Sequence, residues 1–227
     1  MADETSIQPT APTGASHKSI DLRVPSKYLP SPSNAQTTIA KPFVAPTNEW
    51  LWGTWTVTHS TLSMWRSAQN VRITYSPHNK STSPAPDTNE PSVNDNLVEY
   101  EKKDGRGSVK SVFGIEKPDP AISGAWNWRG KGLLVIASSH WEILGWGERP
   151  VAGGKGVERW AVTWFAPTLF TEEGVDIYSD RKEGLSKQTA DDIIKALKGL
   201  EAPKLTQLVD KQMMEVAISL PWKESPK

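Results

Sequence analysis

The stretch from Trp126 to Tyr178 constrains the fold most strongly, because short segments with alternating side chains follow one another closely there. Glycine-containing turns such as residues 153–156 separate these segments. Closely spaced short segments of this kind predict an antiparallel β-meander. Aromatic residues recur along nearly every segment, and successive side chains of a strand point to opposite faces. The stretch therefore predicts a β-barrel with an aromatic-lined interior.

Alternation and turn residues extend this prediction to the rest of the chain. We expect strands over residues 53–59, 71–75, 97–101, 108–115, 125–130, 132–138, 139–147, 157–165 and 174–178. The pair Asp104-Gly105 is typical of a hairpin turn. Ser186 is a good helix N-cap, Gly199 can end that helix, and a second amphipathic run follows at residues 205–213. The predicted fold is all-β with C-terminal helices, an antiparallel barrel of about eight or nine strands.

The first 45 residues differ in composition from the rest. They are rich in Pro, Ser, Thr and Ala and have no sustained period of a strand or a helix. We expect residues 1–45 to be a disordered tail, with a short docked segment at residues 22–28 as an alternative. Residues 46–227 then form one domain, the barrel with two C-terminal helices.

Charge and composition limit the partners and the compartment. The 26 basic and 26 acidic residues cancel, which argues against nucleic acid or an anionic membrane as a partner. The chain has no cysteine, which excludes disulfides and thiol catalysis and fits a reducing compartment. It has neither a secretory signal pattern nor an apolar run of membrane-spanning length. We expect a soluble, cytoplasmic protein whose oligomeric state the sequence leaves open.

Known sequence motifs for cofactors are missing. The chain has no Gly-x-Gly-x-x-Gly pattern after a strand, no P-loop and no Gly-x-Ser-x-Gly elbow. The four histidines do not show the His-Glu-x-x-His spacing of a helical zinc site. We therefore expect no cofactor and no metal.

Three residues are candidates for catalysis. His59 shares a strand face with Trp55 and Val57, so an inward Trp55 would place His59 in the interior, where it could act as an acid or base. The alternative is a histidine bonded to a neighbouring strand. His140 and Glu142 share a face, and an interior position would raise the pKa of the carboxylate. If that face is exterior, the pair only solubilises the strand.

The ligand-binding candidates are mainly aromatic. Eleven tryptophans are present, and ten of them lie between Trp50 and Trp164. Aromatic residues occur on both faces of some strands, so periodicity alone leaves open which face is inside. We expect a ligand to contact several of Trp126, Trp128, Arg129, Trp141, Trp146, Trp160, Trp164, Asp176 and Tyr178. Arg129, if interior, would need an anionic partner, and a ligand carboxylate, Asp176 or Glu142 could serve.

The motif Gly53-Thr54-Trp55 opens the first strand and resembles the Gly-x-Trp of the lipocalin and calycin superfamily. The meander and the trailing helices add to this resemblance, which covers residues 50–199. It implies that Trp55 packs across the closed end of the barrel and that Arg181 stacks on it. A Thr-Asp-Tyr motif between the middle strands is missing, and the second helix is additional. The stretch is also similar to uncharacterised fungal lipocalin-like proteins, some of which serve natural-product pathways.

The resemblance and the aromatic interior together imply a function. We expect the protein to bind a bulky hydrophobic small molecule of polyketide, terpenoid or polyene type. It would act as a cofactor-free cyclase or isomerase that holds a flexible substrate in a reactive conformation. The alternatives are a non-catalytic carrier and a binder of haem or another pigment.

Overall fold

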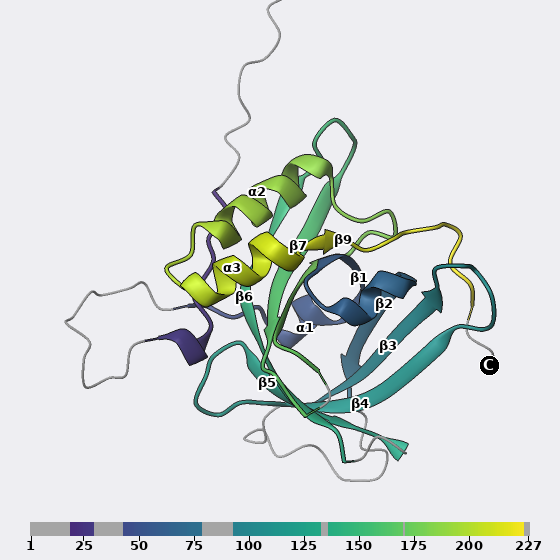
Figure 1. The fold of residues 1–227 in the computed structure, drawn as a ribbon, viewed down its shortest axis with the longest axis horizontal. Coiled ribbons are helices and arrows are strands. Elements are labelled where there is room, and N and C mark those ends of the chain that lie inside the picture. Colours follow the sequence, from purple (N-terminus) through teal and green to yellow (C-terminus); the bar gives the residue numbers. More distant parts are fainter. Residues whose placement is uncertain (1–18, 30–42, 79–92, 133–135, 170, 225–227) are drawn as a thin grey trace, which may run out of the picture.

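The computed structural model describes residues 19–29, 43–78, 93–132, 136–169 and 171–224 (Figure 1). Its strands are β1 (Gly53–Ser60), β2 (Ala68–Pro77), β3 (Asn94–Lys102), β4 (Lys110–Pro118), β5 (Ala125–Gly130), β6 (Ser138–Pro150), β7 (Val157–Phe165), β8 (Gly174–Ser179) and β9 (Met214–Glu215). Its helical segments are η1 (Ser26–Tyr28), α1 (Asn48–Leu51), η3 (Ser63–Ser67), α2 (Lys187–Lys198) and α3 (Pro203–Gln212). None of these helices is long and apolar enough to cross a membrane.

Strands β1 to β8 form a closed barrel. Each strand pairs antiparallel with the next strand in the chain, β8 pairs with β1, and the short β9 adds to β1. The predicted antiparallel barrel with C-terminal helices is thereby confirmed. The separate strand expected over residues 132–138 is wrong at its described positions, where Gly132 and residues 136–137 lie outside strands and β6 begins at Ser138.

Two of the three register shifts in the described barrel strands, the third being in β2 between Gln69 and Arg72, change which side chains of β1 and β6 face the interior. The pairing of β1 with β8 shifts between Val57 and His59, and the pairing of β6 with β7 shifts between Ile143 and Gly145. A bulge inserts one residue and reverses the alternation beyond it. Simple alternation therefore predicts the wrong face for the residues of β1 that follow Val57 and for the residues of β6 that follow Ile143.

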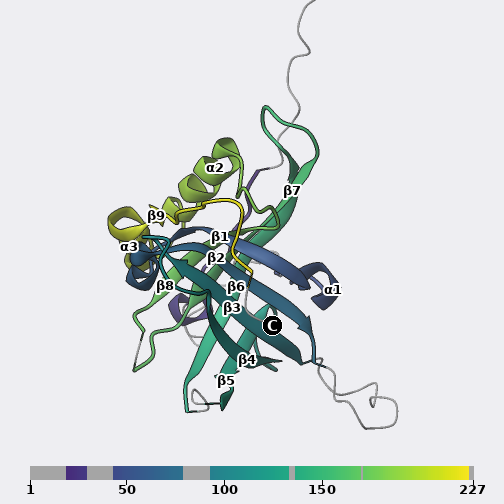
Figure 2. The ribbon, with the colours of Figure 1, turned by 90° about the vertical axis from the view of Figure 1, so that its right-hand side faces the viewer.

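Aromatic and aliphatic side chains form two layers, one inside the barrel and one outside. Trp55, Trp126 and Trp141 belong to the inner layer. Trp160 and Trp164 belong to the outer layer, which the helices α2 and α3 cover. Helix α2 starts where the Ser186 side chain accepts a hydrogen bond from the backbone N–H of Thr189, and its buried residues recur at helical spacing. Figure 2 shows α3 and α1 on opposite sides of the barrel.

One end of the barrel is closed around Trp55. Its side chain is fully buried, and its indole Nε1 donates to the carbonyl oxygen of Leu51 in α1 at 2.7 Å. The guanidinium of Arg159 lies 5.0 Å from the ring centroid of Trp55. The expected position of Trp55 is correct, but Arg181 is not its partner. Arg181 instead lies 3.8 Å from Glu183.

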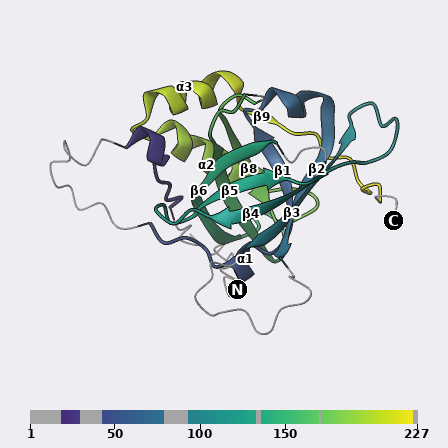
Figure 3. The same ribbon diagram turned by 90° about the horizontal axis from the view of Figure 1, so that it is seen from below.

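Two segments far from the barrel strands in sequence lie on its outer surface. Residues 19–29 dock against the outer layer, where the Arg23 backbone N–H donates to the carbonyl oxygen of Leu144 at 2.8 Å. The C-terminal segment passes β2 (Figure 3), where the Asn70 backbone N–H donates to the carbonyl oxygen of Ala217 at 2.8 Å. Residues 1–18 and 30–42 lie outside the described residues, so the domain division at residue 45 stays a prediction.

Candidate functional site

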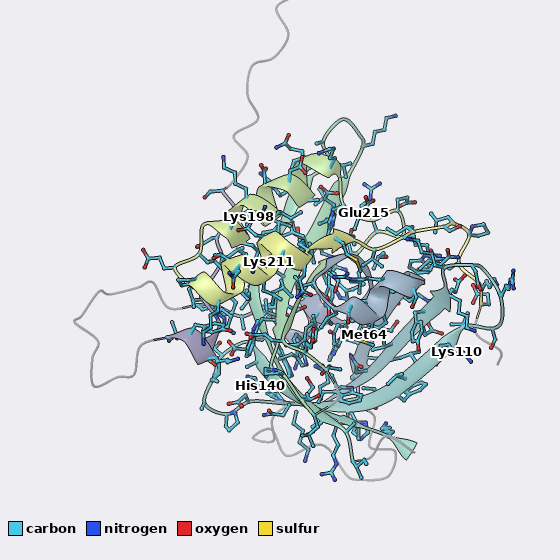
Figure 4. All side chains as sticks on the ribbon, viewed as in Figure 1. Met64, Lys110, His140, Lys198, Lys211 and Glu215 are labelled. Carbon is cyan, nitrogen blue, oxygen red and sulfur yellow. The ribbon has the colours of Figure 1, made fainter. Side chains whose placement is uncertain are left out.

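The barrel contains a cavity of about 220 Å³. Most of its wall is apolar, and its rim includes Met64 of η3 (Figure 4) and Thr171 and Glu172 of the loop between β7 and β8. The other lining residues come from the barrel and its rim: Leu62, Trp65, Ile73, Tyr75, Asn96, Val98, Tyr100, Val112, Glu116, Trp128, Ser139, Trp141, Phe165, Asp176 and Tyr178. The volume is below the roughly 300–1,000 Å³ of pockets for drug-sized ligands. The interior is thus smaller than expected, and a ligand that fits it whole is compact.

Four buried residues that can ionise lie together in the cavity wall. Tyr75 comes from β2, Glu116 from β4, and Asp176 and Tyr178 from β8, and none is more than 2% exposed. Electrostatic interactions join the Tyr178 hydroxyl to the Tyr75 hydroxyl and to the carboxyls of Asp176 and Glu116. The four groups therefore form one coupled cluster.

Burial sets the protonation of the two carboxyls. It raises the pKa of Asp176 to about 7, although the hydrogen bond from Ser60 and the nearby Trp65 indole offset part of the effect. The hydroxyl of Ser60 donates to Oδ1 of Asp176 at 2.5 Å. Burial raises the pKa of Glu116 well above its usual value, and the nearby Trp141 indole offsets only part of this. Asp176 can therefore exchange a proton near neutral pH, while Glu116 favours its neutral form.

Burial also raises the pKa of both tyrosines well above the usual value of a phenol. Both are neutral at physiological pH and can donate hydrogen bonds. Together with the two carboxyls, they give the cavity several donors and one group poised for proton transfer. This combination can polarise a ligand oxygen and move a proton to or from a nearby carbon.

Sequence reasoning found only half of this cluster. Asp176 and Tyr178 were expected to contact a ligand, whereas Tyr75 and Glu116 were not singled out. The signal for Tyr75 was its place on one strand face with Val71 and Ile73. Glu116 offered a weaker signal, because it shares a face with Val112 at the end of an alternating strand.

The structure places four of the predicted ligand-binding tryptophans inside the barrel, at three different positions. Trp128 and Trp141 line the cavity. Trp126 is inside the barrel but stacks on Trp141, with ring centroids 4.5 Å apart. Trp146 packs at the closed end, where its ring centroid lies 4.8 Å from that of Trp50.

The remaining predicted ligand contacts lie outside the cavity. Trp160 and Trp164 belong to the outer layer under the helices. Arg129 is exposed on β5. The interior position considered for these three residues is wrong, because the opposite faces of their strands line the barrel. Trp128 of β5 and Phe165 of β7 both contribute to the cavity wall.

His59 faces outward rather than into the cavity. The bulge after Val57 turns Ser60 inward to Asp176 and turns His59 toward β9 and α2. Burial lowers the pKa of His59, and the charges of Glu215 and Asp191 offset part of this effect. The interior position expected for His59 is therefore wrong, and its catalytic role stays an untested prediction.

The face that carries His140 and Glu142 is also on the outside. Glu142 is fully buried, but under the docked N-terminal segment, where it accepts hydrogen bonds from the backbone N–H and the hydroxyl of Ser26. Arg23 lies 3.2 Å from its carboxylate. His140 lies 3.5 Å from Glu142 and 3.1 Å from the side-chain oxygen of Asn127. The interior position expected for this pair is wrong, because the bulge in β6 separates its face from Trp146.

Among the described residues, no group of three or more His, Asp or Glu side chains could hold a metal ion. The described histidines His59, His78 and His140 are absent from the described cavity lining.

Comparisons with known proteins give one sequence relative and several structural neighbours. No family model matches the chain. It is 27% identical over 200 residues to "Botcinic acid biosynthesis cluster B protein 12" of Botryotinia fuckeliana (strain B05.10), across 86% of this chain and 85% of that protein. Its fold is similar to that of apocrustacyanin C1, with 13% identity, a TM-score of 0.44 and coverage of 75% of this chain and 78% of the other. Its fold is also similar to that of lobster apocrustacyanin A1, with 13% identity, a TM-score of 0.45 and coverage of 77% of this chain and 81% of the other.

The type of barrel follows from the topology of the chain itself. Eight strands in meander order close into a barrel, Trp55 of the Gly53-Thr54-Trp55 motif packs at the closed end, and helices follow the last barrel strand. The protein is an eight-stranded antiparallel β-barrel whose meander resembles that of lipocalins, and it is similar in sequence to a fungal protein whose name assigns it to a biosynthesis cluster.

Proposed function

We propose that the protein binds a hydrophobic small molecule in the barrel cavity and converts it as a cofactor-free cyclase or isomerase. The observation that carries this proposal is a buried carboxyl, Asp176, whose pKa of about 7 places it between its two protonation states in a mostly apolar cavity. A buried titratable group with a strongly shifted pKa in a cavity is a candidate acid or base.

The cavity supplies two contributions to such a reaction. Its walls restrict a flexible substrate to a few conformations, which lowers the entropic part of the barrier. Asp176 transfers a proton, while Tyr75, Tyr178 and the neutral Glu116 stabilise charge that develops on a substrate oxygen. The fungal relative is named for a botcinic acid biosynthesis cluster, which supports a role in a biosynthetic pathway of secondary metabolism. The mostly apolar cavity supports a hydrophobic ligand, for which we propose a polyketide, terpenoid or polyene.

Native mass spectrometry of protein purified from its own source tests binding and identifies the ligand. The turnover of that ligand is then measured for the wild-type protein and for Asp176→Asn, with Asp104→Asn in the exposed β3–β4 turn as a matched control. We expect Asp176→Asn to lower kcat about 100-fold or more while affinity changes little. The control should match the wild type.

A carrier gives a different result in the same experiment. The ligand would be recovered unchanged from the wild-type protein, and Asp176→Asn would alter only its affinity. Full turnover by Asp176→Asn would refute the assigned role of this carboxyl.

A further inference from the structure

Several buried polar atoms in the cavity wall have no hydrogen-bond partner among the described residues. They are the hydroxyl oxygen of Tyr178, Oε2 of Glu116 and the indole nitrogens of Trp65 and Trp141. Tyr75 and Thr163 lie near the Tyr178 hydroxyl, and Trp141 lies near Glu116, but none of these contacts has the geometry of a hydrogen bond. Buried polar groups of folded proteins are nearly always paired, and exceptions call for an explanation. An occupant of the cavity that carries a polar atom would provide the partner.

The protonation of these groups determines what kind of atom they can bind. The Tyr178 hydroxyl and the Trp141 indole are donors, and the Glu116 carboxyl is also a donor in its neutral form. Tyr178 and Glu116 line the same cavity of about 220 Å³, so one compact ligand can reach both. The unpaired groups therefore favour an acceptor oxygen over a donor.

The charge of the cavity wall limits the ligand further. The described lining contains the acidic residues Glu116, Glu172 and Asp176 but no Lys, Arg or His. Arg129, the arginine expected to pair with a ligand carboxylate, is exposed on the outer face of β5. A buried anionic group would be unpaired here and would lie beside acidic side chains, which is strongly unfavourable.

We propose that the cavity selects a neutral hydrophobic ligand with a carbonyl oxygen, held by the Tyr178 hydroxyl and the Glu116 carboxyl, and that it rejects carboxylates. This inference rests on the proposed binding of a hydrophobic molecule in the cavity and specifies its chemical class. The carbonyl would lie among the groups that can exchange protons, so an enolisable or cyclising ketone fits the proposed reaction.

Three probes of nearly equal shape test this selectivity. They are 2-acetylnaphthalene, its alkene analogue 2-isopropenylnaphthalene, in which a CH₂ group replaces the oxygen, and the carboxylate 2-naphthoate. Affinities are measured by isothermal titration calorimetry at neutral pH. We expect the ketone to bind about 3- to 10-fold more tightly than the alkene, the equivalent of one net hydrogen bond. The carboxylate should bind more than about tenfold more weakly than the ketone.

Variants connect the preference to the named groups. Tyr178→Phe should reduce the preference for the ketone over the alkene to about twofold or less. Tyr28→Phe is the matched control, because Tyr28 lies outside the barrel and donates to Glu173. Glu116→Gln keeps a donor and should keep part of the preference, whereas Glu116→Met should reduce it. The glutamate variants also serve as the test if Tyr178→Phe does not fold.

The outcomes separate this inference from the proposed function. Equal affinities for ketone and alkene, or a carboxylate that binds as tightly as the ketone, would overturn the selectivity and leave hydrophobic binding intact. An unchanged preference in both Tyr178→Phe and Glu116→Met would also overturn it. If none of the three probes binds, the proposed function fails for ligands of this size, and the inference fails with it.

Discussion

The two ends of the barrel interior have similar aromatic walls but differ in how their polar groups are paired. At the closed end, the Trp55 indole donates to Leu51, and Arg159 donates to Asp180 and to the carbonyl oxygen of Trp50. In the cavity, Tyr178 and Glu116 each keep a buried atom without a partner among the described residues. Paired groups specify one packed structure, whereas unpaired groups reduce stability and point to a function.

The closed end should show the largest effect on stability. Trp55→Ala removes a fully buried indole, and we expect a loss of about 3–5 kcal/mol in the free energy of unfolding. Arg159→Ala should be sub-additive with it, because the two side chains are in contact. Urea denaturation of the single and double variants measures this coupling. Arg181→Ala is the control, and sub-additivity of Trp55→Ala with Arg181→Ala instead would contradict the assigned contact.

In the cavity, Asp176 should make stability depend on pH. Its folded-state pKa of about 7 exceeds the ordinary value of 3.8, so the folded protein binds this proton more tightly than the unfolded chain. The stabilising effect is complete below about pH 4 and is lost as the pH rises toward 7, by up to about 1.4 kcal/mol per pH unit.

Thermal melts of the wild type and Asp176→Asn between pH 4 and pH 7 test this prediction. The variant should become more stable relative to the wild type as the pH rises. Glu116 has a pKa shifted in the same direction and is present in both proteins, so the comparison largely removes its contribution. A stability difference that stays constant across this range would show that Asp176 does not titrate there.

Glu142 should behave as a structural residue of the outer surface. Glu142→Ala leaves Arg23 and Ser26 without their shared carboxylate, so we expect a loss of about 1–3 kcal/mol in stability. Ligand affinity should remain unchanged, because this side chain is not part of the described cavity lining. Urea denaturation and calorimetry with the 2-acetylnaphthalene probe measure the two effects. A loss of affinity without a loss of stability would place Glu142 at the ligand after all.

The smallest effect should come from Tyr178→Phe in the apo protein. Its hydroxyl has no partner among the described residues, so its removal should change stability by less than about 1 kcal/mol or increase it. Tyr28→Phe instead removes a hydrogen bond of 2.5 Å to Glu173, and we expect a cost of about 1 kcal/mol. Thermal melts of both variants compare the cavity with the outer surface. A larger loss for Tyr178→Phe would mean that its hydroxyl is satisfied in the folded state.

Local patterns determined the strands, the helices and the closed end. Alternation from Trp126 to Tyr178 predicted the meander, and the resemblance of the motif at Gly53 to the lipocalin Gly-x-Trp implied a buried Trp55. The N-cap at Ser186 marked the start of the first C-terminal helix. These features depend on contacts between residues close in sequence or on simple periods, so one chain is enough to recognise them.

Tertiary structure decided which face of each strand is inside and therefore where the site lies. Both faces of β7 carry aromatic residues, and only the docking of α2 and α3 placed Trp160 and Trp164 outside. Bulges turned His59 outward, and a segment 116 residues away in sequence covered Glu142. Pairing register and the packing of distant segments are non-local, because they depend on which surfaces meet after the chain has folded.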